Sequence, residues 1–341
     1  MLGLKENKAF ISITALLVMA IILTSSLFLL YISKMEYLIL NIKNNSIQSY
    51  YLGEGKIYKI LYQDKYYYNE VLPRIEAYLK YGSFARYYSP KIKLEYEDLE
   101  YGDSYRNVNI SFIIEENRRV MVLDTKSKFS DIDKGIQAKV NIIKDFYEMG
   151  IPILYNDSID EESLDEYLLY MDYISKEIKL PMPNNDIIGI DSKDFDNIFI
   201  YNDLPKGNCI EFYRNNMEDP IKKQYFNKQL FLILRGDTNL FIDAKEDKLV
   251  LKGIVYTEGD IILNKDIEFQ GILILNSGQI YVSPNATLKL EGMILSRDYP
   301  FGNLENENKV EINYNILMIK SNGVYLPGFI EPRIKIIKGV I

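Results

Sequence analysis

The stretch AFISITALLVMAIILTSSLFLLYI, residues Ala9–Ile32, contains no charged side chain. A helix of this length rises about 36 Å and can cross a hydrocarbon core of about 30 Å. A cleaved secretory signal has a shorter apolar region that ends in small residues, whereas this stretch ends in leucine, tyrosine and isoleucine. It therefore predicts a transmembrane helix over residues 9–32, with a buried helix of a soluble protein as the alternative. The side chains expected to anchor this helix and to pack against other helices are Phe10, Leu16, Leu17, Ile21 and Leu27.

The charges that flank this stretch indicate its orientation. Lys5 and Lys8 precede it, whereas Lys34 is balanced by Glu36 on the other side. An excess of positive charge on the N-terminal side favours a cytoplasmic N-terminus. We therefore expect a short cytoplasmic leader over residues 1–8. The chain would cross the cell membrane once, and its main body would lie outside the cytoplasm.

The composition excludes several classes of site. The chain of 341 residues has no histidine and one cysteine, Cys209, so imidazole bases, His-ligated metals and thiolate clusters are absent from it. Its net charge of −8 argues against wrapping of nucleic acid. We expect no cofactor, no metal and no enzymatic activity, and the sequence identifies no small-molecule substrate.

The helical pattern continues beyond the membrane segment. Apolar residues with helical spacing occur over Met35–Ile42 and again over Ile57–Leu61, with a polar interval between them. Gly53 and Gly55 would each weaken a helix here by about 1 kcal/mol. We expect a helical stalk over residues 33–82. A helix unbroken from residue 9 to residue 61 would be about 80 Å long.

A short motif in this stalk carries a resemblance to a known family. Residues 48–57 read Gln-Ser-Tyr-Tyr-Leu-Gly-Glu-Gly-Lys-Ile. The segment over residues 5–61 resembles the N-terminal segment of PilX-type minor pilins and related type IV pilus assembly proteins, whose motif is Gln-Ala-Tyr-Tyr-Leu-Ala-Glu-Ala-Gly-Ile. Gly53, Gly55 and Lys56 depart from that motif. The matching residues are Gln48, Tyr50, Tyr51, Leu52, Glu54 and Ile57.

The resemblance implies partners, a fold and a processing state. Besides the lipid bilayer, the implied partners are other pilin or pseudopilin subunits, against which residues 48–57 would dock. The implied fold packs an antiparallel sheet onto the C-terminal half of the long helix. Typical pilins are cleaved after a glycine and carry glutamate at the fifth mature position, but a cut after Gly3 would put Lys8 there. We expect the leader to remain, and the missing glutamate resembles the special minor subunits at filament tips.

Residues 83–230 are expected to form the α+β head that this fold requires. A helix with its body over Leu164–Ile178 is predicted to begin at a cap formed by Asp157 or Ser158. Residues 181–228 show turn-forming residues and no clear period, so their structure is left unassigned. Strands are predicted from β-branched residues over Val108–Ile114, Arg119–Leu123 and Ile136–Ile143.

A short repeat occupies residues 231–300. LKGIVYTEGDIIL, from residue 251, aligns with FQGILILNSGQIYV, from residue 269, so that two glycines match. One such unit cannot bury its apolar face alone, whereas stacked coils bury a continuous core. We predict a β-solenoid of about three to four coils, with an antiparallel meander as the alternative. A positive φ or a tight corner would require glycine at one position of each coil, namely at Gly253, Gly271 and Gly292.

Together these features predict an α+β protein. A transmembrane helix extends into a stalk, and a pilin-like antiparallel sheet with helices precedes a small C-terminal solenoid. Residues 301–341 would close the fold with strands, among them Ile312–Ile319 and Ile334–Ile337.

The predicted function is that of a non-enzymatic, membrane-anchored minor pilin-like subunit, which contributes to assembly or tip structure in a type IV pilus or related secretion filament. The alternative is a single-pass surface scaffold or binding protein, unrelated to pili, whose solenoid is similar to that of bactofilins. A membrane-tethered polysaccharide enzyme, by similarity to pectin-degrading β-helix enzymes, is the third hypothesis.

Overall fold

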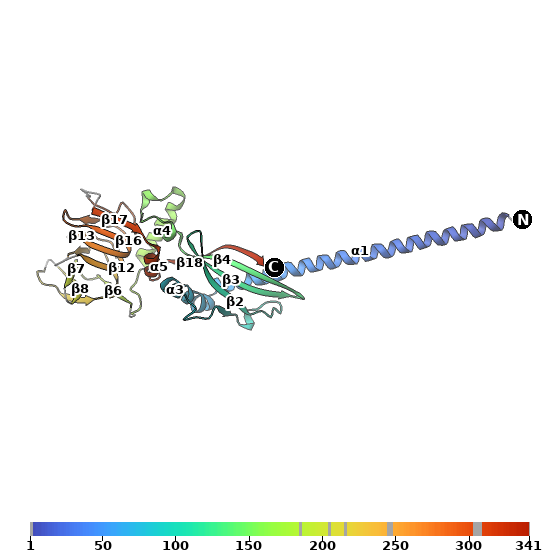
Figure 1. Cartoon of the computed structure of the whole chain (residues 1–341), viewed down its shortest axis with the longest axis horizontal. Helices are drawn as coiled ribbons and strands as arrows, with labels where there is room; N and C mark the ends of the chain where they lie inside the picture. Colours follow the sequence, from blue (N-terminus) through green and yellow to red (C-terminus); the bar gives the residue numbers. More distant parts are fainter. Residues whose placement is uncertain are drawn as a thin grey trace.

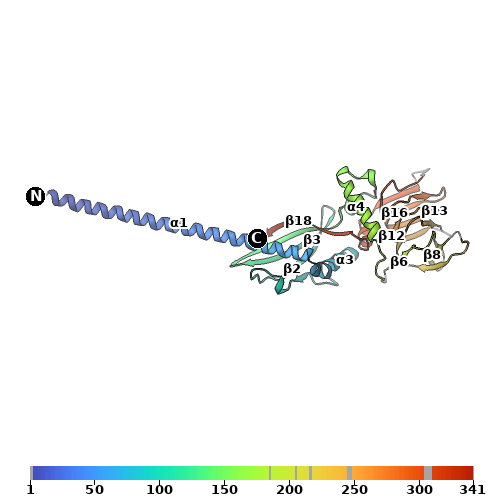
Figure 2. The same cartoon turned by 180° about the vertical axis from the view of Figure 1, so that it is seen from behind.

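The computed structural model describes residues 3–183, 186–203, 206–214, 217–243, 248–302 and 309–340, with side chains from Phe10 onward. The molecule is elongated: a long N-terminal helix, an antiparallel sheet and a β-solenoid follow one another along one direction (Figures 1 and 2). The C-terminus lies beside the helix, at the end of the sheet from which the helix projects. The mixed α+β class agrees with the prediction.

Helix α1, Gly3–Tyr62, is continuous over 60 residues and about 90 Å. The apolar segment and the first part of the stalk therefore form one helix, and neither Gly53 nor Gly55 interrupts it. Every side chain over residues 10–44 is exposed, and the first buried one is Ser49. Of the predicted leader, residues 1 and 2 lie outside the described residues and residues 3–8 are helical.

The chain turns after α1, so the predicted helical stalk over residues 33–82 is built from several helical elements. Gln63 is extended, with φ −88° and ψ 122°, and this conformation ends α1. Pro73 lies in the first turn of α3, the helix that contains residues 72–81. Backbone N–H groups in a first turn have no partner within the helix, so a proline, which lacks the N–H, is tolerated there. The elements that follow are α2 (Asp64–Tyr66), the π-helical turn η1 (Tyr67–Val71) and α3 (Leu72–Tyr81).

An antiparallel sheet of order β1-β2-β3-β4-β18 packs on the C-terminal part of α1 through β3 and β4. We call it the helix-bound sheet. Burial alternates along the first half of β2 and along most of β4, because one face of the sheet covers α1 and the other faces water. The three predicted strands are present, and each is longer than predicted, the middle one most of all. Their bounds are β1 Lys91–Lys93, β2 Asn107–Glu115, β3 Arg118–Phe129, β4 Ile132–Ile143 and β18 Ile330–Val340.

The chain leaves this sheet after β4 and returns to it only with β18. The intervening residues begin with the 3₁₀ turns η3 (Asp145–Glu148) and η4 (Asn156–Ser158), the short strand β5 (Ile153–Leu154) and helix α4 (Glu161–Glu177). The N-cap of α4 is Asp160, so the predicted cap at Asp157 or Ser158 is wrong. Both residues belong to η4, where the Ser158 hydroxyl accepts the Tyr155 N–H at 2.8 Å.

The repeat forms a β-solenoid of parallel strands, and the antiparallel meander is excluded. Each coil gives one strand to each of two sheets: β6 with β7, β10 with β11, β12 with β13, and β14 with β15. The solenoid begins at β6, within the stretch left unassigned, and the antiparallel strands β8 and β9 extend the second sheet beyond β7.

The strands of the first solenoid sheet are β5, which pairs with β16, and β6 (Ile187–Asp191), β10 (Gln229–Leu234), β12 (Leu249–Thr257), β14 (Ile267–Leu275), β16 (Leu288–Ser296) and β17 (Val310–Tyr314). Those of the second are β7 (Asn197–Asp203), β8 (Gly207–Tyr213), β9 (Lys222–Phe226), β11 (Asn239–Ile242), β13 (Ile261–Leu263) and β15 (Ile280–Val282).

The predicted glycine row forms one column of the solenoid. Gly253 pairs with Gly271, and Gly271 pairs with Gly292, on three adjacent strands. Their φ angles are 137°, 151° and 150°, as the requirement for glycine predicted. They lie in the middle of nine-residue strands, however, and not in turns. A Cβ atom on Gly271 would lie 1.8 Å from the carbonyl oxygen of Gly253, so only glycine allows this ladder.

The tail agrees with the predicted closing strands only in part. The strand predicted over Ile334–Ile337 is present within β18, which joins the helix-bound sheet. Within the described residues of the tail, strand β17 adds to the solenoid, and it pairs with the first half of β16 while β5 pairs with the second half. A helix, α5 (Ile316–Gly323), replaces the end of the strand predicted over Ile312–Ile319. The reason is Asn315, whose side-chain oxygen accepts the N–H groups of Leu317 and Met318 and caps the helix.

Two hydrophobic cores meet at the first solenoid sheet. One fills the interior of the solenoid, and the other runs from α1 and the helix-bound sheet to the outer side of β12, β14 and β16. The second halves of these strands are therefore buried on both faces, which explains their uninterrupted apolar runs. Residues of α4 and α5 belong to this second core, which joins the solenoid firmly to the sheet.

Candidate subunit-packing surface on the long helix

The N-terminal part of α1 is apolar on all sides and packs against no other described part of the chain. An 18-residue window in it has a mean hydropathy of 2.5, so by length and composition the helix could cross a membrane. The hydroxyls of Thr14 and Thr24 donate to carbonyls one turn earlier, at 2.8 and 2.9 Å, which satisfies them in an apolar medium. The predicted anchoring residues, exposed by 55% to 71%, are Phe10, Leu16, Leu17, Ile21 and Leu27.

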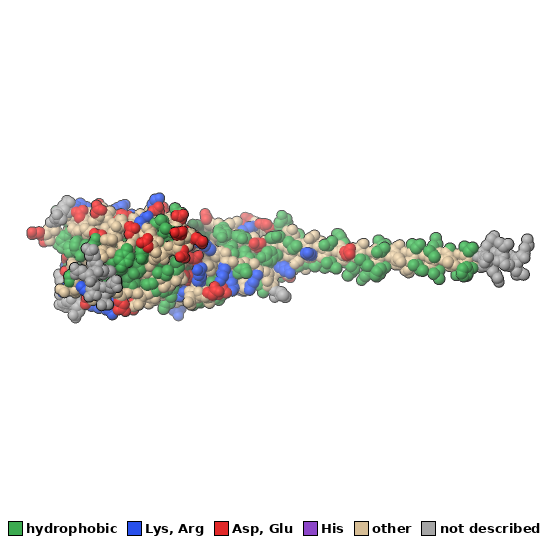
Figure 3. All heavy atoms as spheres, turned by 90° about the horizontal axis from the view of Figure 1, so that it is seen from above, with side chains coloured by type: hydrophobic (Ala, Val, Ile, Leu, Met, Phe, Trp, Pro, Cys, Tyr) green, Lys and Arg blue, Asp and Glu red, His purple; other side chains and the backbone are tan. Residues whose placement is uncertain are grey.

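A stripe of exposed aromatic and aliphatic side chains continues along α1 toward the sheet. Projected at about 100° per residue, its members fall within about 80° of one another. This side of the helix is opposite to the side that carries the buried Ser49, Lys56 and Ile60. We call these residues the outer stripe: Tyr37, Leu40, Ile47, Tyr51, Tyr58 and Tyr62. Figure 3 shows hydrophobic side chains along the projecting helix.

The motif residues do not all point the same way. Leu52 and Ile57 are buried against the sheet, and the Tyr50 hydroxyl donates to the carbonyl of Ile337 on β18 at 3.4 Å. Gln48 and Tyr51 are exposed, and Glu54 is half-buried beside the outer stripe. Three of the six motif residues therefore hold the helix to its own sheet. The other three remain available for another molecule.

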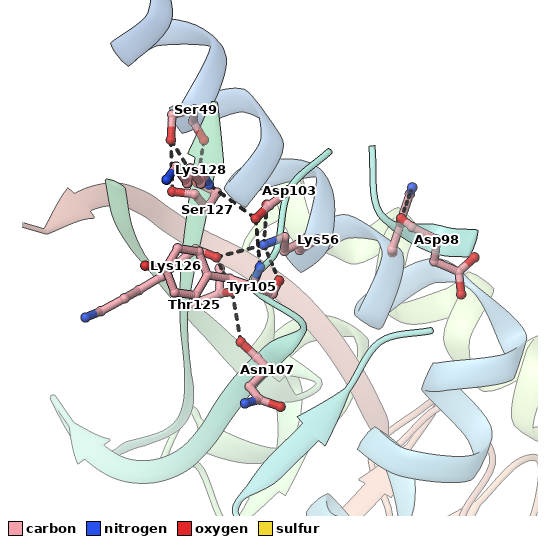
Figure 4. Close-up of polar contacts among 11 residues, drawn as sticks. Ser49, Lys56, Asp98, Asp103, Tyr105, Asn107, Thr125, Lys126, Ser127 and Lys128 are labelled. Carbon is pink, nitrogen blue, oxygen red and sulfur yellow. Dashed lines mark hydrogen bonds and ion pairs between the residues drawn. The ribbon is translucent and has the colours of Figure 1, made fainter. Parts of the chain in front are cut away.

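Polar contacts fix α1 on the sheet in one register (Figure 4). Ser49 donates its hydroxyl to the carbonyl of Ser127 at 3.0 Å, and Ser127 donates to the carbonyl of Ser49 at 2.5 Å. Two helical turns later, the Lys56 ammonium contacts Asp103 at 2.5 Å and donates to the carbonyls of Tyr105 and Lys126 at 2.6 and 2.7 Å. Burial lowers the pKa of Lys56, and its hydrogen bond to Asp103 opposes that shift.

Two of the three departures from the motif have a physical reason here. A Cβ on Gly53 would lie 2.4 Å from Cδ1 of Ile136 on β4, so glycine lets the helix approach the sheet closely. Lys56 supplies the buried ion pair with Asp103. Gly55 has open space at its Cβ position, and nothing in the structure requires glycine there.

Sequence reasoning missed the outer stripe and the polar contacts of Ser49 and Lys56. A signal for the stripe exists, because Tyr37, Tyr51 and Tyr58 recur at multiples of seven residues. The partners of Ser49 and Lys56 lie far along the chain, and no local pattern points to them.

The remaining candidate chemistry is sparse. Cys209 is buried, and burial raises the pKa of its thiol. Within the described residues, no group of three His, Cys, Asp or Glu side chains is arranged to hold a metal ion. Comparison with protein-family models, curated proteins and solved structures finds no match to this chain. Function must therefore be inferred from its own residues.

Proposed function

We propose that this chain is a non-enzymatic, membrane-anchored, minor-pilin-like subunit of a type IV pilus or a related secretion filament. The carrying observation is helix α1, which is exposed over residues 10–44, uncharged over residues 10–32, and fixed to an antiparallel sheet only from Ser49 onward. Such a helix can exchange lipid for neighbouring helices without rearranging the rest of the chain. The motif resemblance over residues 48–57 supports the same assignment.

The outer stripe is the surface on which a neighbouring subunit would pack. Its side chains face away from the sheet, so a second helix can approach to the usual 8–10 Å. The solenoid lies beyond the opposite end of the sheet and leaves this approach open (Figures 1 and 2). Burying a large apolar side chain contributes roughly 1.5–3 kcal/mol when burial is complete, so the stripe can supply a stable contact.

Sheared surface filaments test this function. The full chain, expressed in a filament-producing host, should co-purify with the filaments. A Tyr51→Glu variant should stay in the membrane fraction and be lost from the filaments, because a carboxylate would be buried in the helix contact. Tyr101→Glu is the matched control, since Tyr101 is 77% exposed, Tyr51 is 60% exposed, and Tyr101 lies outside α1.

The alternative, a surface scaffold unrelated to pili, makes a different prediction. The chain would then be found in the membrane fraction and be missing from filaments, with Tyr51→Glu and Tyr101→Glu behaving alike. That result would contradict the proposed function.

A further inference from the structure

The charges of this protein are divided between its two parts. Residues 151–329, which include the solenoid, carry 17 basic and 29 acidic side chains, a net charge of −12. Residues 33–150 and 330–341, which include the helix-bound sheet, carry 21 basic and 18 acidic side chains, a net charge of +3. Figure 3 shows Lys and Arg side chains concentrated at the level of this sheet. An acidic protein therefore has a basic region near its membrane end.

The outer face of the helix-bound sheet, which faces away from α1, forms an open groove of about 960 Å³. Its lining includes five cations and two carboxylates. Both carboxylates are engaged: Asp124 accepts the Gln137 amide at 2.9 Å, and Asp133 accepts the Tyr105 hydroxyl at 3.2 Å. The cations are Lys91, Lys93, Arg106, Lys126 and Lys134.

The lysines of this groove have no partner among the described residues. No ion pair or side-chain hydrogen bond is formed by the ammonium groups of Lys91, Lys93, Lys126 or Lys134 within the parts of the chain that the structure describes. Elsewhere lysines of this protein do pair, as Lys139 does with Glu115 at 2.6 Å. An uncompensated set of like charges is the arrangement that a polyanion would stabilise.

The strands set the spacing of the charged and amide side chains on this face. Lys91 and Lys93 lie two residues apart on β1, about 7 Å along the strand. Lys91 begins a row across all five strands, in which amide side chains alternate with charges. That row is Lys91, Asn109, Asp124, Gln137 and Lys338. Ammonium groups can meet phosphates, and the amide of Asn109, which lies between Lys91 and Asp124 in this row, can bond a hydroxyl.

Two aromatic rings line the groove, those of Tyr96 and Tyr105. The Arg106 guanidinium lies 3.8 Å from the centre of the Tyr96 ring, and the Tyr105 hydroxyl is held by Asp133. Single-stranded nucleic acid is held by stacking of successive bases on aromatic faces, and among the described residues of this groove the exposed ring is that of Tyr96, 72% exposed, which already has Arg106 over it. The chemistry favours a polyanion without bases.

We propose that the outer face of the helix-bound sheet binds a linear phosphodiester polymer with a polyol or sugar backbone. The site is open and shallow, so it holds a chain through several weak contacts and has no enclosed pocket for one small anion. It lies on the face opposite α1, and binding there does not depend on the proposed filament role.

The test is binding of poly(glycerol phosphate) to the full chain in detergent micelles, measured over a range of salt concentrations. Three Lys→Gln changes in the groove, at Lys91, Lys93 and Lys126, should weaken binding about tenfold. They should also lower the slope of log Kd against log salt by about 2. Both effects follow from the loss of three charge contacts.

The matched control makes the same change at three exposed lysines elsewhere, Lys176, Lys252 and Lys265, and should leave affinity within about twofold. Equal losses in both triple variants, or no loss in the groove variant, would overturn the proposal. A single-stranded oligonucleotide of equal charge should bind more weakly than poly(glycerol phosphate). Equal or tighter binding of the oligonucleotide would overturn the assigned polymer class.

Discussion

Gly271→Ala tests the column of glycines that builds the solenoid. An alanine there would need φ 151°, which L-residues rarely adopt and which costs about 1–3 kcal/mol. Its Cβ would also lie 1.8 Å from the Gly253 carbonyl oxygen, and moving that backbone adds about 1–3 kcal/mol. We expect a loss of about 2–6 kcal/mol in the free energy of unfolding. Urea unfolding of the full chain in detergent can be followed by tyrosine fluorescence, since tryptophan is absent.

Gly236→Ala separates backbone strain from the clash. Gly236 also has a positive φ, 61°, but nothing lies within 4 Å of its Cβ position, so its cost should be about 1 kcal/mol. Gly302, although outside the glycine column, is a poor control because its Cβ would lie 2.3 Å from the Tyr281 ring. The reasoning is refuted if Gly271→Ala is as stable as the wild type or no less stable than Gly236→Ala.

Three further predictions concern the helix. Lys56→Met should lower the free energy of unfolding by about 3–5 kcal/mol, because it leaves Asp103 buried without its counter-ion. In a double-mutant cycle, adding Asp103→Asn should recover much of that loss. Gly53→Ala should destabilise the chain, because its Cβ would clash with Ile136. Gly55→Ala, on the same helix but with open space at the Cβ position, should stabilise the chain by about 0.5–1 kcal/mol. Equal effects of the two changes in thermal melts would contradict the close approach of α1 to the sheet. Protease added to intact protoplasts should digest residues 33–341, and full protection would reverse the expected topology.

Local sequence patterns are sufficient to predict those elements whose structure depends on residues close together in the sequence. The uncharged stretch over residues 9–32 and the helical spacing after it predict α1, because helix formation depends on neighbours three and four residues apart. The glycine column could be predicted because the repeat aligns Gly253, Gly271 and Gly292 at one position, and the structure places them on adjacent strands. Only their place within strands, instead of at turns, differs from the prediction.

Contacts between distant residues could not be predicted in this way. Strand β6 joins the solenoid by pairing with β10, although the turn-rich sequence around it shows no repeat. Strand β18 returns to β4 after the whole solenoid, and no local signal indicates that pairing. In the sequence, Lys56 is only a departure from the motif, and its role in the structure becomes clear from its ion pair with Asp103. In each case the local structure depends on a contact with a residue far along the chain, and the sequence around one partner carries no information about the other.

Photo-crosslinking along α1 tests the central claim most directly. Benzoylphenylalanine would replace Tyr37, Tyr51 or Tyr58 of the outer stripe in the full chain, and Tyr96 or Tyr101 as exposed controls. After irradiation of intact cells, the stripe positions should give crosslinks to apolar helices of other filament subunits, identified by mass spectrometry, and the controls should not. Crosslinks to lipid alone at the stripe, or equal yields at stripe and control positions, would contradict a helix that packs into a filament.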